Sequence, residues 1–195
     1  MKNKLTIELL CKEAKIFAKT ESSHEEPSIF GVTDGKAVGT YLEHKFQAYL
    51  KQKYIYEEGS SAKGIDFPEL MIDIKVTSIK QPQSSCPFKN ARQKIFGLGY
   101  SLLLFVYDKI DDQNARKSRL DILHSIFIKA ERTADYQITT GILNIINNKG
   151  NSDDIAAFMQ AHLLPVEEIQ AMQIADEIIL NPPNIGYLTI SNALQ

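Results

Sequence analysis

Asp66, Asp73 and Lys75 are the residues whose types and spacing could do chemistry. They lie within residues 64–75, and the proline-containing stretch 68–71 between the two aspartates is typical of a tight turn. A hairpin that reverses at this turn places Asp66 opposite Asp73, and opposite residues project to the same face. Lys75 joins that face because side chains alternate along a strand with a period of two. We therefore expect two carboxylates and an ammonium group side by side.

The alternate residues of the second strand are apolar and β-branched. They are Ile72, Ile74 and Val76, and the same hairpin pairs Phe67 with Ile72. This alternation predicts that one face of the hairpin packs on the core. The charged face should then be an exposed, concave surface backed by hydrophobic residues.

Two carboxylates this close repel each other unless a cation lies between them. Hard oxygen ligands with open coordination positions suit Mg²⁺, which keeps several waters and binds substrate phosphate oxygens; Mn²⁺ can substitute for it. Such a metal lowers the pKa of a bound water and stabilises negative charge at phosphorus. Lys75 would position the attacking water, and Glu43, in a helix upstream, is a candidate further ligand. Glu69 competes for one carboxylate role, and the plain structural alternative is a solvent-facing hairpin bridged by Lys75.

Charge is unevenly distributed along the chain. The formal net charge is −2, but residues 74–107 contain five basic and no acidic side chains. A positive segment in an otherwise acidic chain is a plausible footprint for phosphates. The polar and basic residues expected to contact phosphates and base edges are Lys80, Gln81, Gln83, Lys89, Arg92 and Gln93.

The elements that must position these residues follow from apolar periodicity and turn chemistry. Helices are predicted over residues 4–19, 36–53, 87–98, 131–147, 152–162 and 165–180. Strands are predicted over residues 54–58, 63–67, 71–78, 101–107, 120–129 and 185–190. The order is a helix, three strands, a helix and a strand, followed by helices, so we predict a mixed α/β (α+β) fold. We divide it into an N-terminal helix and loop (1–35), a core (36–130) and a helical C-terminal extension (131–195).

The core resembles the PD-(D/E)xK nuclease superfamily and is most similar to its type II restriction endonucleases. The resemblance rests on Asp66, on Asp73-Ile74-Lys75, and on the surrounding order of elements over residues 36–130. It implies a restriction-endonuclease-like core in which Asp66, Asp73 and the Ile74 carbonyl bind Mg²⁺ and Lys75 is catalytic. The helix glutamate of some members corresponds to Glu43. Two features depart from the pattern: Ile65 stands where proline is common, and the two acids are unusually close in sequence.

The resemblance implies an Mg²⁺-dependent endonuclease that cuts double-stranded DNA. Site-specific cutting predicts a homodimer, since a two-fold protein reads a two-fold site, and the C-terminal extension either packs on the core or forms the dimer interface. One alternative is a structure-specific or repair/recombination nuclease of the same superfamily. Another is a catalytically silent DNA-binding module with a helix-turn-helix at residues 152–180. That segment has six acidic residues and no lysine or arginine, which disfavours contact with phosphates.

Several other classes of protein are disfavoured. No glycine-rich phosphate loop is present, so we expect no nucleotide cofactor. The four histidines share no spacing that suggests a zinc site. The longest apolar run is too short to cross a membrane, and the N-terminus has no secretory pattern. We therefore expect a cytoplasmic protein whose two cysteines stay reduced.

Overall fold

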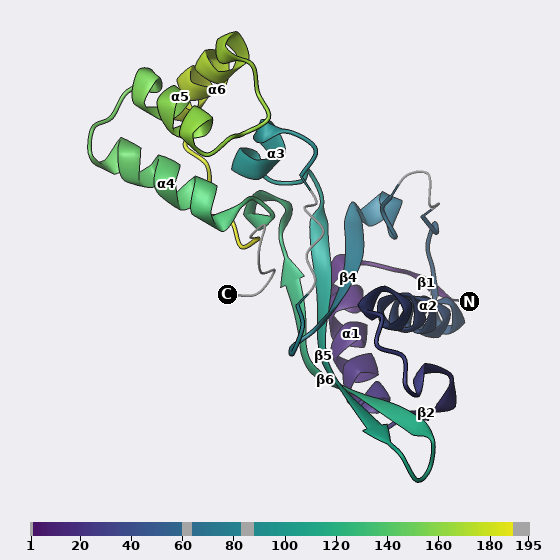
Figure 1. Ribbon diagram of the computed structural model, residues 1–195. Helices are drawn as coiled ribbons and strands as arrows, with labels where there is room; N and C mark the ends of the chain where they lie inside the picture. The colour runs from purple at the N-terminus through teal and green to yellow at the C-terminus, as the bar shows by residue number, and fades with distance from the viewer. Residues whose placement is uncertain (1, 60–63, 83–87, 189–195) are drawn as a thin grey trace. The chain divides into compact units, whose positions relative to one another are not determined.

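The computed structural model describes residues 2–59, 64–82 and 88–188 (Figure 1). The chain forms two compact units. The sheet unit comprises Met1–Gln83 and Leu102–Phe127, and the helical unit comprises Ser84–Ser101 and Ile128–Gln195. The predicted mixed α/β class, with a restriction-endonuclease-like core and a helical C-terminal part, is confirmed. The division at residues 35 and 130 stays a prediction.

A four-stranded sheet forms the centre of the sheet unit. Its strand order is β2-β6-β5-β4, with β2 at Glu25–Glu26, β6 at Lys117–Ile128, β5 at Ser101–Asp112 and β4 at Ile72–Ser78. The strand β2 pairs antiparallel with β6. A separate two-stranded sheet pairs β1 (Asn3–Lys4) parallel with β3 (Tyr54–Ile55). Residues 102–107 of β5 are all buried, as their unbroken apolar run predicts.

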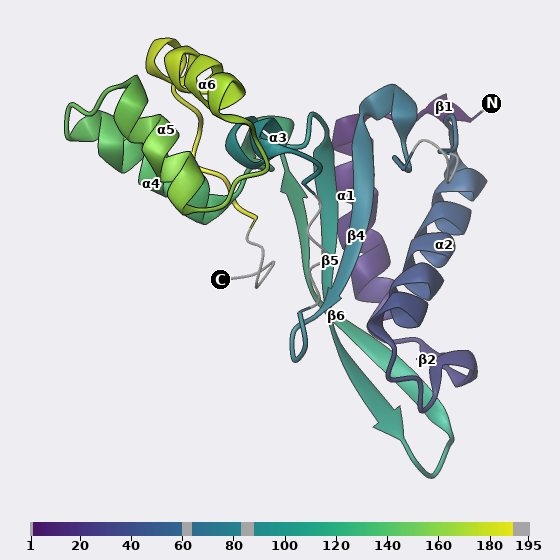
Figure 2. The same ribbon diagram turned by 45° about the horizontal axis from the view of Figure 1, so that its top comes forward.

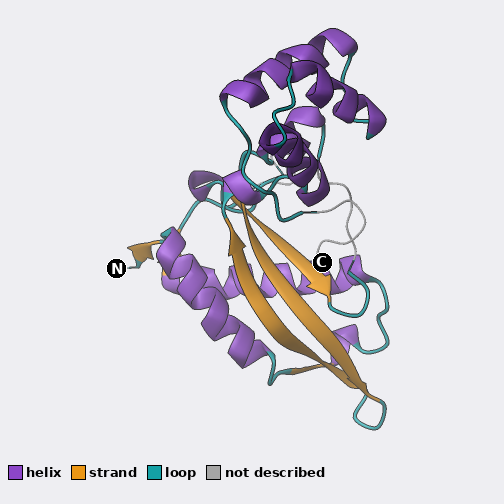
Figure 3. Ribbon diagram, turned by 90° about the vertical axis from the view of Figure 1, so that its left-hand side faces the viewer, coloured by secondary structure: helices purple, strands orange, loops and turns teal. Residues whose placement is uncertain are grey.

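Two helices, α1 (Ile7–Glu21) and α2 (Gly35–Lys53), cover one face of this sheet (Figures 2 and 3). Both begin after residue types that favour helix starts: the side chains of Thr6 and Asp34 accept hydrogen bonds from backbone N–H groups of the first turn. Phe17 of α1, Phe46 of α2 and Phe105 of β5 meet in the core, with ring centroids 5.0–6.1 Å apart. Burial of these rings fixes α2 against the sheet.

A buried carboxylate also joins the two helices. Glu13 of α1 accepts hydrogen bonds from the Lys53 ammonium at 2.7 Å and the Tyr54 hydroxyl at 2.8 Å, and also from the Tyr49 hydroxyl. These three hydrogen bonds offset the free-energy cost of removing the carboxylate from water. Despite its burial, they lower the pKa of Glu13 to about 2.

The helical unit contains α3 (Ala91–Phe96), α4 (Tyr136–Asn147), α5 (Ser152–Ala161) and α6 (Glu168–Leu180). The Asp135 side chain caps α4, and Asn151 forms a capping box at the start of α5. The core of this unit includes Ile95, Ile142, Ile155, Met159, Ala171 and Ile178. In place of the strand predicted over 185–190, Leu188 forms a single parallel bridge with Asp135, and residues 189 and 190 lie outside the described residues.

Four further predicted elements differ from the structure. The helix predicted over 87–98 covers only Ala91–Phe96, and its expected first residue, Pro87, lies outside the described residues. The strand at 54–58 ends at Ile55, and the described part of the strand at 63–67 contributes one bridge, at Phe67. The strand predicted to end at residue 107 continues to Asp112 as β5. Its last five residues pair with β6 but contain no apolar run, so the sequence pattern did not indicate them. In the parts of the chain that the structure describes, no helix is long and apolar enough to span a membrane.

Candidate active site

A cavity of about 330 Å³ in the sheet unit collects the residues predicted to do chemistry. Its walls come from α2, from the segment that precedes β4, and from β4 itself. The lining residues are Glu43, His44, Gln47, Gly59, Gly64, Ile65, Asp66, Asp73, Ile74 and Lys75. All five residues proposed from the sequence as catalytic or metal-binding are therefore part of one cavity wall.

The register of the predicted hairpin is confirmed. Phe67 and Ile72 form an antiparallel bridge through backbone hydrogen bonds of 2.9 and 3.2 Å. The chain reverses through a 3₁₀ turn at Pro68–Leu70, and Met71 closes it with φ at 53°. This tight reversal explains how two acids so close in sequence can share one site.

Asp66 is held by two hydrogen bonds, one to each carboxylate oxygen. The side-chain Nε2 of Gln47 donates to Oδ1 at 2.9 Å, and the backbone N–H of Ile74 donates to Oδ2 at 2.7 Å. Gln47 lies on α2 and Ile74 on β4, so the orientation of Asp66 depends on both elements. Such fixed carboxylates are suited to hold a ligand without rearrangement.

Asp73 and Lys75 form an ion pair in the same cavity. The Lys75 Nζ lies 2.6 Å from Asp73 Oδ2, and the ammonium side chain is half exposed. Asp73 is only 5% exposed, so the prediction that all three charges stand on an exposed face is wrong for this residue. The Asp66 side chain lies against the start of β4, where it accepts the hydrogen bond from the Ile74 N–H. Burial, together with the neighbouring Asp66 carboxyl group, raises the pKa of Asp73 to about 6, although Lys75 opposes the shift.

Glu43 is a third carboxyl group that lines the same cavity. It is partly buried on α2, and burial followed by repulsion from Asp66 raises its pKa to about 7. Raised carboxyl pKa values mean that the negative charges in this cavity are poorly compensated by the protein. A bound cation would remove that penalty, so the electrostatics of this cavity favour a cation.

The donor set fits a hard divalent metal ion. Among residues 2–59, 64–82 and 88–188, no three His, Cys, Asp or Glu side chains form a group that could hold a metal by themselves. Two aspartates that line one cavity, completed by waters, would give the incomplete oxygen shell that a hard divalent ion accepts when it also binds phosphate. Glu69, the rival acid, lies outside the cavity and pairs with Lys4 at 3.1 Å.

The residues predicted to contact DNA fall in two places. Lys80 and Gln81 follow β4 in the sheet unit, and the Lys80 Nζ lies 2.6 Å from an oxygen of Asp108. Gln83 lies outside the described residues.

The remaining three belong to the helical unit. Arg92 makes a two-pronged ion pair with Glu177 on α6, with N–O distances of 2.6 and 2.8 Å. The Gln93 side-chain oxygen accepts a hydrogen bond of 2.8 Å from the backbone N–H of Lys89. The Gln93 amide is therefore engaged at the N-terminal end of α3. The Lys89 side chain is exposed.

Two residues of the site were missed from the sequence. Gln47 follows Glu43 by four residues, and this spacing puts both on one helix face, which is a signal that could have found it. Gly59 lies against the segment that carries Asp66: its N–H donates to the Asp66 carbonyl at 2.9 Å, and a Cβ atom there would stand 1.8 Å from the Ile65 oxygen. No pattern in the sequence indicates that approach.

Known proteins resemble this chain over nearly its whole length. The family model described as "Type II restriction enzyme NspV" matches residues 4–195. The type II restriction enzyme NspV of Nostoc sp. (strain ATCC 29411 / PCC 7524) is 65% identical over 191 residues, which cover 98% of this chain and 87% of that protein. No solved structure matches the chain significantly. The chain therefore belongs to the NspV family of type II restriction enzymes.

Proposed function

We propose that this type II restriction endonuclease hydrolyses phosphodiester bonds of double-stranded DNA in the cavity of Asp66, Asp73 and Lys75, with Mg²⁺ as its working metal. Family membership gives the reaction class, DNA cleavage with a divalent metal. The observation that carries the assignment to this cavity is the convergence of both aspartates and the lysine with Glu43, where burial raises two carboxyl pKa values.

The carboxylates of Asp66 and Asp73 and the backbone carbonyl of Ile74 would hold the metal, with Glu43 as a further ligand. When bound, the metal supplies a more acidic water and stabilises negative charge at phosphorus. Mn²⁺ offers the same oxygen preference and can substitute. Gln47 and the Ile74 N–H keep Asp66 in place through their two hydrogen bonds.

Lys75 performs the electrostatic part of the reaction. Asp73 holds its ammonium group at 2.6 Å, and the side chain remains half exposed toward an incoming strand. There it orients the attacking water and offsets the negative charge that develops on the phosphoryl oxygens. A preorganised charge of this kind acts mainly in the transition state.

Contacts to the DNA are proposed for Lys80, Gln81, Gln83, Lys89, Arg92 and Gln93. Lysine and arginine would bind phosphates, and the glutamine amides would contact base edges. The enzyme is proposed to act as a homodimer on a two-fold symmetric target. The helix α6 offers a candidate self-contact, because Ile169 and Leu180 are 76% and 78% exposed.

The substitution Asp73→Asn tests the active site. It should abolish cleavage of plasmid DNA in Mg²⁺ while binding of a DNA duplex in metal-free buffer stays the same or tightens, because one negative charge near phosphate is removed. Asp153→Asn is the matched control, since Asp153 is an exposed acid in the first turn of α5. Cleavage by Asp73→Asn at the control's rate would rule out this cavity as the active site.

A further inference from the structure

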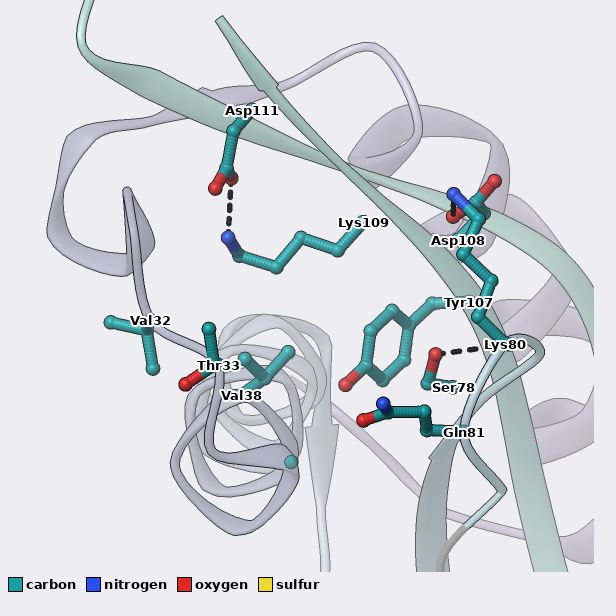
Figure 4. A pocket seen from close by; sticks show the side chains of 11 residues that line it. Val32, Thr33, Val38, Ser78, Lys80, Gln81, Tyr107, Asp108, Lys109 and Asp111 are labelled. Carbon is teal, nitrogen blue, oxygen red and sulfur yellow. Dashed lines mark hydrogen bonds and ion pairs between the residues drawn. The ribbon is translucent and has the colours of Figure 1, made fainter. Parts of the chain in front are cut away.

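A second cavity, of about 360 Å³, lies in the sheet unit beside the start of α2 and the end of β4 (Figure 4). Thr33, Gly35 and Val38 line it from around the start of α2. Ser78 and Gln81 line it at the end of β4, and Tyr107 lines it from β5. Apart from Gln81 and its neighbour Lys80, none of its lining residues has a role in the proposed function.

Tyr107 gives this cavity an unusual polar group. The residue is 3% exposed, and none of the hydrogen bonds among the described residues involves its hydroxyl. Figure 4 shows the hydroxyl pointing into the space beside Gln81 and Val38, with no dashed line reaching it. The hydroxyl of Tyr49, by contrast, donates to Glu13. A hydroxyl that faces a cavity without a protein partner can pair with a polar group of a ligand there.

The hydroxyl is a donor at neutral pH. Burial raises the pKa of Tyr107, and the nearby Asp34 carboxylate raises it further, so the phenol keeps its proton. Gln81 adjoins it with an amide that can both donate and accept. The two groups together match a polar edge with adjacent acceptor and donor atoms.

The charges around the cavity favour a neutral ligand. Lys80 is paired with Asp108 at 2.6 Å, and Lys109 is paired with Asp111. Each lysine therefore already has a carboxylate partner, and a phosphate would have to displace it. The uncharged polar lining consists of hydroxyl and amide groups between apolar walls, and such groups can form hydrogen bonds with the edge of a DNA base.

The two cavities share the same two elements. Along α2, Val38 and Glu43 are five residues apart, which is roughly 7.5 Å at 1.5 Å per residue. Along β4, Ser78 and Lys75 are three residues apart, or roughly 10 Å. At about 3.4 Å per nucleotide of one strand, these spans correspond to two or three base steps. A duplex cut in the first cavity thus has bases within reach of the second.

We propose that the second cavity receives the polar edge of a DNA base, and that the Tyr107 hydroxyl and the Gln81 amide select that base by hydrogen bonding. This inference rests on the proposed function, because it takes the DNA to be positioned by the first cavity. A site built to hydrogen-bond one ligand rejects an analogue that leaves its buried donor unpaired. One base pair of the target should therefore depend on this cavity.

The test compares Tyr107→Phe with Tyr49→Phe. Each removes only a phenolic hydroxyl, from the second cavity in one case and from the α1–α2 contact in the other. The substrates are duplexes that carry a site cut by the wild-type enzyme, together with every single base-pair change of that site. Binding to each duplex is measured in metal-free buffer, and cleavage of each is measured in Mg²⁺. Tyr107→Phe should keep its melting temperature, because its hydroxyl has no partner among the described residues. It should lose about 5- to 150-fold of discrimination at one base pair, the range expected for a specific base contact.

Tyr49→Phe should lower the melting temperature and leave discrimination intact at every position. Gln81 is exposed, and Gln81→Met removes its amide. This variant should lose discrimination at the same base pair as Tyr107→Phe. Wild-type discrimination in both Tyr107→Phe and Gln81→Met would overturn the inference. Because metal-free binding ratios do not require cleavage, that result is separable from failure of the proposed active site, which Asp73→Asn reports.

Discussion

At the residue scale, the proposed chemistry depends on how Lys75 is held. It lies 2.6 Å from a buried aspartate whose own carboxyl group faces a second acid. An ammonium group in this position is fixed before the substrate arrives, which is the condition for electrostatic stabilisation of a transition state.

Lys75→Ala should therefore lower single-turnover cleavage by about 10²–10⁴-fold, the range for a positioned acid–base or electrostatic group. Affinity should change little. The loss of one phosphate contact changes the slope of log binding constant against log salt concentration by only about one. Lys89→Ala, at an exposed lysine of the helical unit, should show the reverse: weaker binding and nearly normal cleavage at saturating enzyme. A Lys75→Ala enzyme that binds weakly but cuts normally when saturated would identify Lys75 as a phosphate clamp.

At the element scale, the site depends on the packing of α1 and α2 against the sheet. Glu13 contributes to that packing through three hydrogen bonds, and its pKa in the folded protein is about 2. The ordinary value is near 4.5. The depressed pKa stabilises the fold fully above about pH 4.5, and this stabilisation is lost as the pH falls toward 2.

Glu13→Gln should accordingly lower the free energy of unfolding at pH 7 by about 1.5–3 kcal/mol, the usual worth of hydrogen bonds to a charged group. The difference between wild type and variant should shrink as the pH falls from 4.5 toward 2. Denaturant unfolding at pH 7, 4 and 3 measures it. A difference that does not vary over this range would show that the charge of Glu13 adds nothing to stability.

The sequence predicts elements best where one physical signal dominates. The helix α2 and the strand β4 were predicted within one residue at each end, because their apolar residues repeat with a clear period and a turn precedes each. The hairpin register followed from Pro68, and with it the approach of Asp66 to Asp73. The pairing of β1 with β3 was not predictable, since each strand has two residues and no pattern. The burial of Asp73 was not predicted, because alternation along a strand gives the face on which a residue lies but not what packs against that face.

At the scale of the whole molecule, the basic segment of the sequence is largely compensated in space. Lys75 pairs with Asp73, Lys80 with Asp108 and Arg92 with Glu177, while Lys94 is only 8% exposed. A run without acids along the chain does not remain without acids once distant segments pack, and no sequence pattern reveals such pairs. Binding DNA through these residues would mean exchanging carboxylate partners for phosphates.

Glu177→Gln should release the guanidinium of Arg92 from this competition. If Arg92 contacts DNA, affinity should rise several-fold at low salt, and the salt dependence should steepen by about one released counterion. The gain should vanish in the double variant Arg92→Ala, Glu177→Gln. Unchanged affinity in Glu177→Gln would make the pair a purely structural link between α3 and α6.

The central claim, that Asp66 and Asp73 form the metal site of the nuclease, can be tested by direct metal binding. The measurement is electron paramagnetic resonance of free Mn²⁺ during titration into the protein with a cleavage-resistant phosphorothioate duplex. The wild-type protein and the Asp153→Asn control should remove Mn²⁺ from solution, and Mg²⁺ should displace it. The double variant Asp66→Asn, Asp73→Asn should bind at least one ion fewer per chain while keeping its folded spectrum. Equal Mn²⁺ binding by the double variant and the control would contradict the account.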